Sequence, residues 1–123
     1  MRALVIDDSR AMRAIIRNTL TELGIEVVEA GDGREGLEQL QQVADLELIL
    51  VDWNMPVMNG LDFIKAVRAD RAYAPVRIMM VTAETEQGQL IRALEAGADE
   101  YLMKPFTRDI LVAKLSLLNV LAE

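Results

Sequence analysis

The sequence of 123 residues contains no cysteine and no histidine. Without cysteine the chain has no disulfide, no thiolate nucleophile and no iron–sulfur site. Without histidine, a Ser-His-Asp triad, a histidine general base and the usual zinc sites are all excluded. Any chemistry must therefore use carboxylates, hydroxyls, lysine or arginine, and a carboxylate cluster would favour a hard cation such as Mg²⁺.

Positive charge and long apolar runs are also scarce. The 13 Lys and Arg residues face 20 Asp and Glu residues, a net charge of −7, which argues against sequence-independent binding to nucleic acid. No apolar run approaches the roughly 18 residues that a membrane span needs, and the run Ala3–Ile6 is too short for a signal-peptide core. We therefore expect a cytoplasmic protein that binds neither nucleic acid nor membrane.

What the sequence does contain is five short apolar runs that alternate with segments of helical periodicity. The expected strands are Ala3–Ile6, Glu26–Ala30, Leu46–Val51, Val76–Val81 and one around Tyr101–Met103. The first, third and fourth are apolar on both faces, which is typical of a parallel sheet covered by helices on both sides. Five such units predict an α/β fold with a doubly wound, five-stranded parallel sheet, because a closed barrel needs eight. We expect one domain, 1–123, with no output domain after its last helix.

Local signals mark the helix boundaries. Ser9 is expected to cap the first helix, and Gly24 lies where a glycine ends it. Asp32 with Glu35 three residues later resembles a capping box for the second helix. Thr107 is expected to cap a last helix that runs towards Leu121.

Polar residues follow four of the five strands. They are Asp7, Asp8, Asp52, Thr82 and Lys104. In an open parallel sheet, ligands bind beyond the carboxyl ends of the strands, so these side chains are expected to converge on one edge. Three neighbouring carboxylates repel one another, and a divalent cation such as Mg²⁺ removes that penalty.

A carboxylate beside Mg²⁺ can act as a nucleophile on phosphorus and form an aspartyl phosphate. The transferred group develops charge on three oxygens, which need cations and hydrogen-bond donors around them. Mg²⁺ can take one oxygen, Lys104 a second and the Thr82 hydroxyl a third. Each polar strand end then has a use in phosphoryl transfer.

Four segments together resemble the receiver domain of two-component response regulators, and in particular its single-domain members. They are Asp7-Asp8, Asp52-Trp53-Asn54-Met55-Pro56 with Asn59-Gly60, Val81-Thr82-Ala83, and Tyr101-Leu102-Met103-Lys104-Pro105-Phe106. The resemblance covers the whole chain. It implies a flavodoxin-like fold with strand order 2-1-3-4-5.

The resemblance also assigns roles to individual residues. Asp52 would accept a phosphoryl group from a sensor histidine kinase, and Thr82 and Lys104 would bind its oxygens. The Mg²⁺ ligands would be Asp7, Asp8, Asp52 and the backbone carbonyl of Asn54. Lys104-Pro105 would be joined by a cis peptide bond.

Further implied roles concern switching and lifetime. Tyr101 would turn inward as Thr82 moves towards the phosphate, with the small Ala83 leaving room. Asn54 and Glu84 would tune how water reaches the acyl phosphate. The face made by the fourth helix, fifth strand and fifth helix would then control a downstream protein target or output domain. We expect self-phosphorylation and autodephosphorylation with no separate metabolite substrate, and a monomer or a weak phosphorylation-dependent dimer.

The last helix adds a hypothesis about that face. Its polar residues Arg108, Asp109, Ser116 and Asn119 share one arc of a helical wheel. Val112 falls among them and Leu115 lies at their edge. We expect Val112 and Leu115 to extend the partner surface.

Two other functions compete with this interpretation. Gly31-Asp32-Gly33-Arg34-Glu35-Gly36 matches the dinucleotide pattern G-x-G-x-x-G, but Asp32 would place a negative charge where the pyrophosphate must bind. A Mg²⁺-dependent phosphatase of the haloacid dehalogenase type also uses an aspartate nucleophile. It needs Asp-x-Asp after the first strand, whereas this chain has Asp7-Asp8-Ser9.

Overall fold

The structure, a computed structural model, describes residues 1–83 and 87–120 of the chain. Five parallel strands form one sheet in the order β2-β1-β3-β4-β5. They are β1 (Arg2–Ile6), β2 (Glu26–Ala30), β3 (Leu46–Asp52), β4 (Arg77–Ala83) and β5 (Glu100–Lys104). This confirms the doubly wound α/β sheet and its flavodoxin-like strand order.

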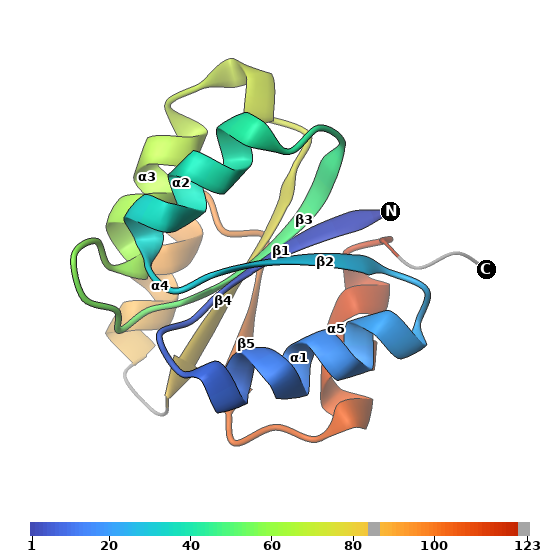
Figure 1. Cartoon of the computed structure of the whole chain (residues 1–123). Coiled ribbons are helices and arrows are strands. Elements are labelled where there is room, and N and C mark those ends of the chain that lie inside the picture. Colours follow the sequence, from blue (N-terminus) through green and yellow to red (C-terminus); the bar gives the residue numbers. More distant parts are fainter. Residues whose placement is uncertain (84–86, 121–123) are drawn as a thin grey trace.

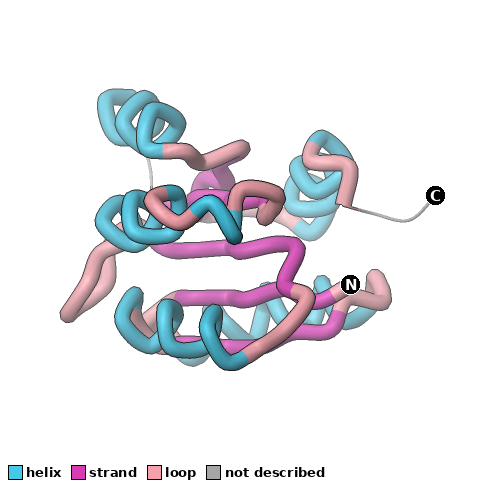
Figure 2. Tube along the Cα trace, turned by 90° about the horizontal axis from the view of Figure 1, so that it is seen from above, coloured by secondary structure: helices cyan, strands magenta, loops and turns pink. Residues whose placement is uncertain are grey.

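Helices cover both faces of the sheet (Figure 1). They are α1 (Arg10–Glu22), α2 (Gly33–Gln42), α3 (Gly60–Arg68), α4 (Gln87–Ala96) and α5 (Arg108–Leu117), with a short 3₁₀ turn, η1 (Arg71–Tyr73), between α3 and β4. In the view from above the sheet lies between two layers of helices (Figure 2). No helix in the described ranges has the length and apolar character needed to cross a membrane.

Alternating side chains of the central strands divide the core into two halves. Ile49 and Val51 of β3 pack on the side of α2, α3 and α4, while Leu48 and Leu50 pack on the side of α1 and α5. All four side chains are fully buried. A strand buried on both faces reads as a continuous apolar run, which is why β3 could be recognised from the sequence.

The local helix signals are confirmed. The Ser9 hydroxyl accepts the Met12 N–H at 3.2 Å, and the Asp32 carboxylate accepts the Glu35 N–H at 2.8 Å. Gly24 follows α1 with a φ of +81°, a backbone conformation that glycine adopts without strain. Thr107 caps α5, which ends at Leu117, and Leu121 lies outside the described residues.

β3 and β4 end later than expected at the functional edge. Asp52 and Thr82 are strand residues, because each is paired in the sheet: Asp52 with Val81 and Thr82 with Met103. Hydrogen bonding to neighbouring strands continues the ladder past the last apolar residue. The side chains therefore project from rigid strand backbone, although the sequence pattern predicts that both strands stop earlier.

The hypothesis about Leu115 is wrong. Its side chain is fully buried among Leu111, Leu118 and the residues of β1 and β3, whereas Val112 is half-buried. The exposed apolar side chains of α5 are instead Ile110 and Leu117. The partner surface therefore cannot include Leu115.

Arg68 at the end of α3 ties several segments together. Its guanidinium donates to the Asp99 carboxylate at 2.9 Å and to the backbone carbonyls of Tyr73, Ala74, Val76 and Gly97. Asp99 in turn accepts the Ile78 N–H at 2.9 Å. One side chain thus satisfies carbonyls of the loop before β4 and of the turn before β5.

Candidate functional site

The carboxyl ends of β1, β3 and β5 bring four charged side chains together. Asp7 and Asp8 follow β1, and Asp52 and Lys104 are the last residues of β3 and β5. Each of the three aspartates offers a carboxylate oxygen within 4.8 Å of the others. The Lys104 Nζ lies 3.2 Å from Asp7 Oδ2 and 3.4 Å from Asp52 Oδ2. The cluster expected from the strand ends is therefore present.

Burial makes the charge balance of this cluster unfavourable. Asp7 is 1% and Asp52 6% exposed, and Asp8 is exposed at the mouth of the site. A single ammonium group, that of Lys104, is paired with the two buried carboxylates. Since buried charges need compensation, the cluster has spare negative charge and oxygen ligands for a cation.

The surroundings of Asp52 raise its pKa. Burial raises the pKa of Asp52, and the nearby negative charge of Asp7 raises it further. Lys104 and a backbone hydrogen bond at Asn54 lower the pKa but do not cancel the increase. A second positive charge at this place would favour the ionised, nucleophilic carboxylate. The donor set, three carboxylates with no nitrogen or sulfur ligand, suits Mg²⁺.

Asp7 is held by contacts that sequence reasoning did not find. Its Oδ1 accepts the Ser9 N–H at 2.8 Å, and its backbone carbonyl accepts a hydrogen bond from the Arg13 guanidinium. Arg13 is itself paired with Glu29 of β2 at 3.2 Å. Arg13 lies in the first turn of α1, and nothing in the spacing of charges along the chain distinguishes it from a solvated arginine.

The loop after β3 requires glycine at position 60. The Gly60 N–H donates to the Trp53 carbonyl at 2.9 Å, and a Cβ at Gly60 would lie 2.3 Å from the carbonyl oxygen of Asp52. Asn59 caps α3 by accepting the Asp62 N–H at 2.8 Å. The sequence marks Asn59-Gly60 as a turn, but the close approach of α3 to the backbone of Asp52 appears only in three dimensions.

The remaining predicted residues lie around this cluster. Thr82 is 4% exposed, and its hydroxyl lies 3.5 Å from the Gln89 side-chain oxygen of α4. Tyr101 is half-buried on β5, and Asn54 is exposed in the loop after Asp52. The Lys104–Pro105 peptide bond is cis, as the resemblance implies. Glu84 lies outside the described residues.

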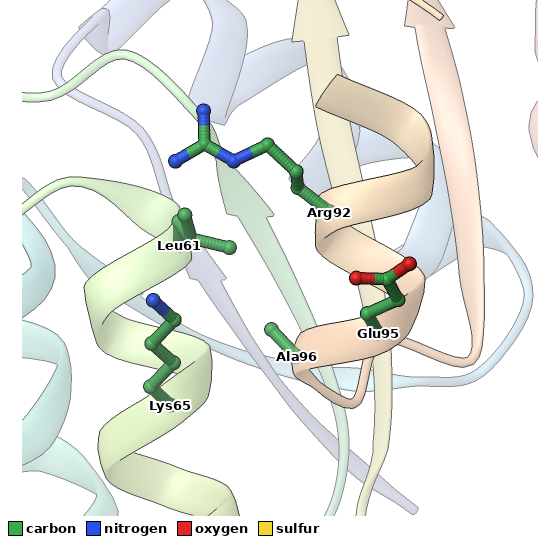
Figure 3. Close-up of a pocket in the computed structure, with 5 residues that line it drawn as sticks. All are labelled: Leu61, Lys65, Arg92, Glu95 and Ala96. Carbon is green, nitrogen blue, oxygen red and sulfur yellow. The ribbon is translucent and has the colours of Figure 1, made fainter. Parts of the chain in front are cut away.

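A separate groove of about 290 Å³ lies between α3 and α4 (Figure 3). Its lining residues are Leu61, Lys65, Arg92, Glu95 and Ala96. None of them belongs to the carboxylate cluster, but Arg92 reaches across the groove, and its guanidinium lies 5.7 Å from the centre of the Trp53 ring. Trp53 directly follows Asp52, so Arg92 of α4 contacts the residue next to this carboxylate in the chain.

The glycine-rich segment before α2 has a structural explanation. A Cβ at Gly33 would lie 2.7 Å from the Met58 carbonyl oxygen, and one at Gly36 would lie 2.5 Å from the Ile6 side chain. The Asp32 carboxylate already caps the N-terminus of α2, where a pyrophosphate would have to bind. The geometry therefore disfavours dinucleotide binding through Gly31, Gly33 and Gly36.

Comparison with known proteins points in one direction. The family model described as the response regulator receiver domain matches residues 3–116. Chemotaxis protein CheY1 of Helicobacter pylori is 49% identical over 116 residues, which cover 94% of both chains. The Chemotaxis protein CheY homolog of Campylobacter jejuni is 47% identical and is matched over 89% of its length. The structure of Vibrio cholerae chemotaxis protein CheY4 superposes with a TM-score of 0.89 at 38% identity, covering 95% of this chain and 97% of that one.

Proposed function

The chain belongs to the response regulator receiver domain family, and on that premise we propose that it is a phosphorylation-dependent signalling switch. The phosphoryl acceptor is Asp52. The observation that supports this choice is the placement of the Asp52 carboxylate, 6% exposed, 3.4 Å from the Lys104 ammonium and within 4.8 Å of two further carboxylates. A buried carboxylate with this surrounding can be both a nucleophile and a cation ligand.

The proposed cofactor is Mg²⁺. Its proposed ligands are Asp7, Asp8, Asp52 and the backbone carbonyl of Asn54. The three carboxylates form the cluster described above, and Asn54 lies in the loop two residues after Asp52. When bound, Mg²⁺ neutralises the excess negative charge and supplies a positive centre for one phosphoryl oxygen. Lys104 and the Thr82 hydroxyl serve the other oxygens as hydrogen-bond donors.

The proposed donor is a phosphorylated histidine of a sensor kinase, which membership of the receiver-domain family supports. This chain has no histidine of its own. An Asp52 carboxylate oxygen forms the new bond to phosphorus while the bond between phosphorus and the imidazole nitrogen breaks. The electron pair leaves with the imidazole. Water later attacks the phosphorus, the bond between phosphorus and the Asp52 oxygen breaks, and inorganic phosphate leaves as the carboxylate is restored. Asn54 and Glu84 tune that step. No separate metabolite is turned over.

Phosphorylation is proposed to act on a partner through Thr82 and Tyr101. The phosphoryl group adds about −1.5 to −2 charges at Asp52, and the Thr82 hydroxyl moves towards it. Tyr101 follows and alters the face made by α4, β5 and α5, which binds a downstream protein target or output domain. Exposed apolar side chains occur on both helices of this face, Ile91 and Leu94 on α4 and Ile110 and Leu117 on α5.

Residues 1–123 are proposed to make up one receiver domain that is a monomer or a weak phosphorylation-dependent dimer. A cytoplasmic location belongs to the same proposal. The proposed kinase carries a phosphohistidine, and the proposed target has a surface complementary to the α4–β5–α5 face.

Incubation with radiolabelled acetyl phosphate tests the proposed function. Wild type is expected to take up label in the presence of Mg²⁺ and to lose that uptake when Mg²⁺ is chelated. Asp52→Asn is expected to take up none. Asp109→Asn removes an exposed carboxylate of α5 and serves as the matched control, which should label like wild type. Equal labelling of wild type and Asp52→Asn would overturn the proposal.

A further inference from the structure

Tyr101 is held by two charged side chains that the phosphoryl chemistry does not use. The Lys114 Nζ of α5 lies 3.9 Å from the centre of the Tyr101 ring. The same Nζ lies 3.1 Å from Glu100 Oε1, and this oxygen also accepts the Tyr101 N–H at 3.0 Å. Glu100, Tyr101 and Lys114 thus form a closed set of three contacts.

The position of β5 explains how one lysine reaches both neighbours. β5 is the edge strand, and its side chains alternate between the two faces of the sheet. Leu102 packs with Leu111 and Leu115 of α5, so Glu100 lies on the same face and Tyr101 on the opposite one. Lys114 of α5 thus contacts side chains from both faces of the edge strand, Glu100 and Tyr101.

Partial burial makes these contacts stronger than those of an ordinary surface lysine. The side chains of Lys114 and Glu100 are 21% and 18% exposed, so solvent screens their charges less than at a fully exposed pair. A cation over an aromatic face loses its attraction when the ring rotates away. A rotation that carries the Tyr101 ring away from Lys114 therefore breaks this contact.

We propose that Lys114, anchored by Glu100, restrains the Tyr101 ring and sets how readily it leaves its present orientation. The inference rests on the proposed function in one respect: it takes Tyr101 as the side chain that rotates when Asp52 is phosphorylated. A contact of this strength shifts an orientation equilibrium by about two- to fivefold. Lys114 is thus a positioning residue that opposes the switch before any phosphoryl group arrives.

The chain offers an economical experiment because it has only two tyrosines. Protein labelled with 3-fluorotyrosine gives one ¹⁹F resonance for Tyr101 and one for Tyr73, the latter an internal reference in η1. The variants are Lys114→Met, which keeps an apolar stem but removes the charge, Lys114→Arg, which keeps a cation, and Glu100→Gln, which removes the anchor. Lys65→Met is the control, since Lys65 is exposed and forms no ion pair within the described residues.

In the unphosphorylated protein, Lys114→Met and Glu100→Gln are expected to move the Tyr101 resonance and leave that of Tyr73 unchanged. Lys114→Arg should stay close to wild type, as should Lys65→Met. An unmoved Tyr101 resonance in Lys114→Met, or an equal shift in Lys65→Met, would overturn the restraint.

A titration with beryllofluoride and Mg²⁺, a non-covalent phosphoryl substitute, then separates the restraint from the switch. With the switch in place, Lys114→Met should reach the half-way point of the Tyr101 change at about two- to fivefold lower ligand concentration. An identical half-way point in wild type and Lys114→Met would also overturn the proposal. If the wild-type Tyr101 resonance does not change when beryllofluoride binds, the role of Tyr101 in the proposed function is contradicted. The restraint by Lys114 is then still decided by the spectra of the unphosphorylated proteins.

Discussion

Asp52 carries a charge that costs the metal-free protein stability, and Asp52→Asn should therefore unfold at a higher temperature than wild type. The carboxylate is 6% exposed and has an oxygen within 4.8 Å of one on Asp7. At an effective dielectric constant of about 20, two like charges at that distance repel by about 3.5 kcal/mol. Lys104 at 3.4 Å attracts Asp52 by about 4.9 kcal/mol on the same scale, but this ammonium is shared with Asp7.

The two Coulomb terms nearly offset each other, which leaves the cost of burying the charge. That cost is several kcal/mol per ion before the remaining hydrogen bonds are counted. We take the uncompensated part as about 1–2 kcal/mol. The entropy of unfolding of 123 residues is about 0.26 kcal/mol per kelvin, so the expected rise in Tm is about 4–8 °C.

Mg²⁺ should reverse the order of the two proteins. At a Mg²⁺ concentration about 100 times its Kd, wild type gains about 2.7 kcal/mol, or about 10 °C in Tm. Asp52→Asn lacks one of the three carboxylates and should gain clearly less. The assay is thermal unfolding followed by circular dichroism at low ionic strength, in EDTA and in MgCl₂.

Asp109→Asn is the control in both conditions, because it removes a carboxylate that is exposed on α5. It should show the wild-type gain from Mg²⁺. A metal-free Asp52→Asn that unfolds below wild type would refute the reasoning about the buried charge. An equal gain from Mg²⁺ in all three proteins would refute the placement of the cation.

Three further outcomes follow from the geometry. The pKa of Asp52 is raised above 3.8 in the fold, so the folded protein binds this proton more tightly than the unfolded chain. Metal-free wild type should therefore lose stability relative to Asp52→Asn as pH rises from below 3.8 through the folded pKa. Denaturant titrations across this range measure both free energies of unfolding, and a difference between them that does not change with pH would contradict the prediction. Gly60→Ala places a Cβ 2.3 Å from the Asp52 carbonyl oxygen, so it should cost about 1–3 kcal/mol and slow labelling by acetyl phosphate. Gly88→Ala, whose Cβ meets no other part of the described residues within 4 Å, is the control for urea unfolding. Arg68→Met removes the guanidinium that donates to four backbone carbonyls and to the Asp99 carboxylate, and it should cost about 3 kcal/mol, or about 12 °C in Tm. A loss no larger than that of Arg34→Met, an exposed arginine paired with Glu38, would show that these hydrogen bonds contribute little.

The fold was predictable because its signals are local. Buried parallel strands such as β3 read as apolar runs, and the caps at Ser9 and Asp32 follow from side-chain chemistry within three residues. The convergence of Asp7 and Asp52 also needed no coordinates, because parallel strands place their carboxyl ends at one edge.

The features that escaped prediction depend on contacts between distant segments. Thr82 belongs to β4 because Met103 pairs with it, and Gly60 is required by the backbone of Asp52. Neither contact can be recognised from the residues that are adjacent in sequence.

The wrong prediction for Leu115 shows what helical periodicity cannot decide. Apolar residues occur nearly all round α5, so helical periodicity does not decide which arc faces the core. The fully buried side chain of Leu115 shows that packing against β1 and β3, and not the wheel, sets the exposed face. The contact of Lys114 with Tyr101 cannot be read from the sequence either, because it depends on how α5 packs against β5.

The most direct test of the central claim is to locate the phosphoryl group on the chain. Borohydride reduces an aspartyl phosphate to homoserine, so protein treated with acetyl phosphate and Mg²⁺, then reduced and digested, can be mapped by mass spectrometry. The account predicts homoserine at position 52 and at no other aspartate, and none when Mg²⁺ is chelated. Homoserine at Asp7 or Asp8 with Asp52 unmodified, or no homoserine in a folded wild-type protein, would contradict it.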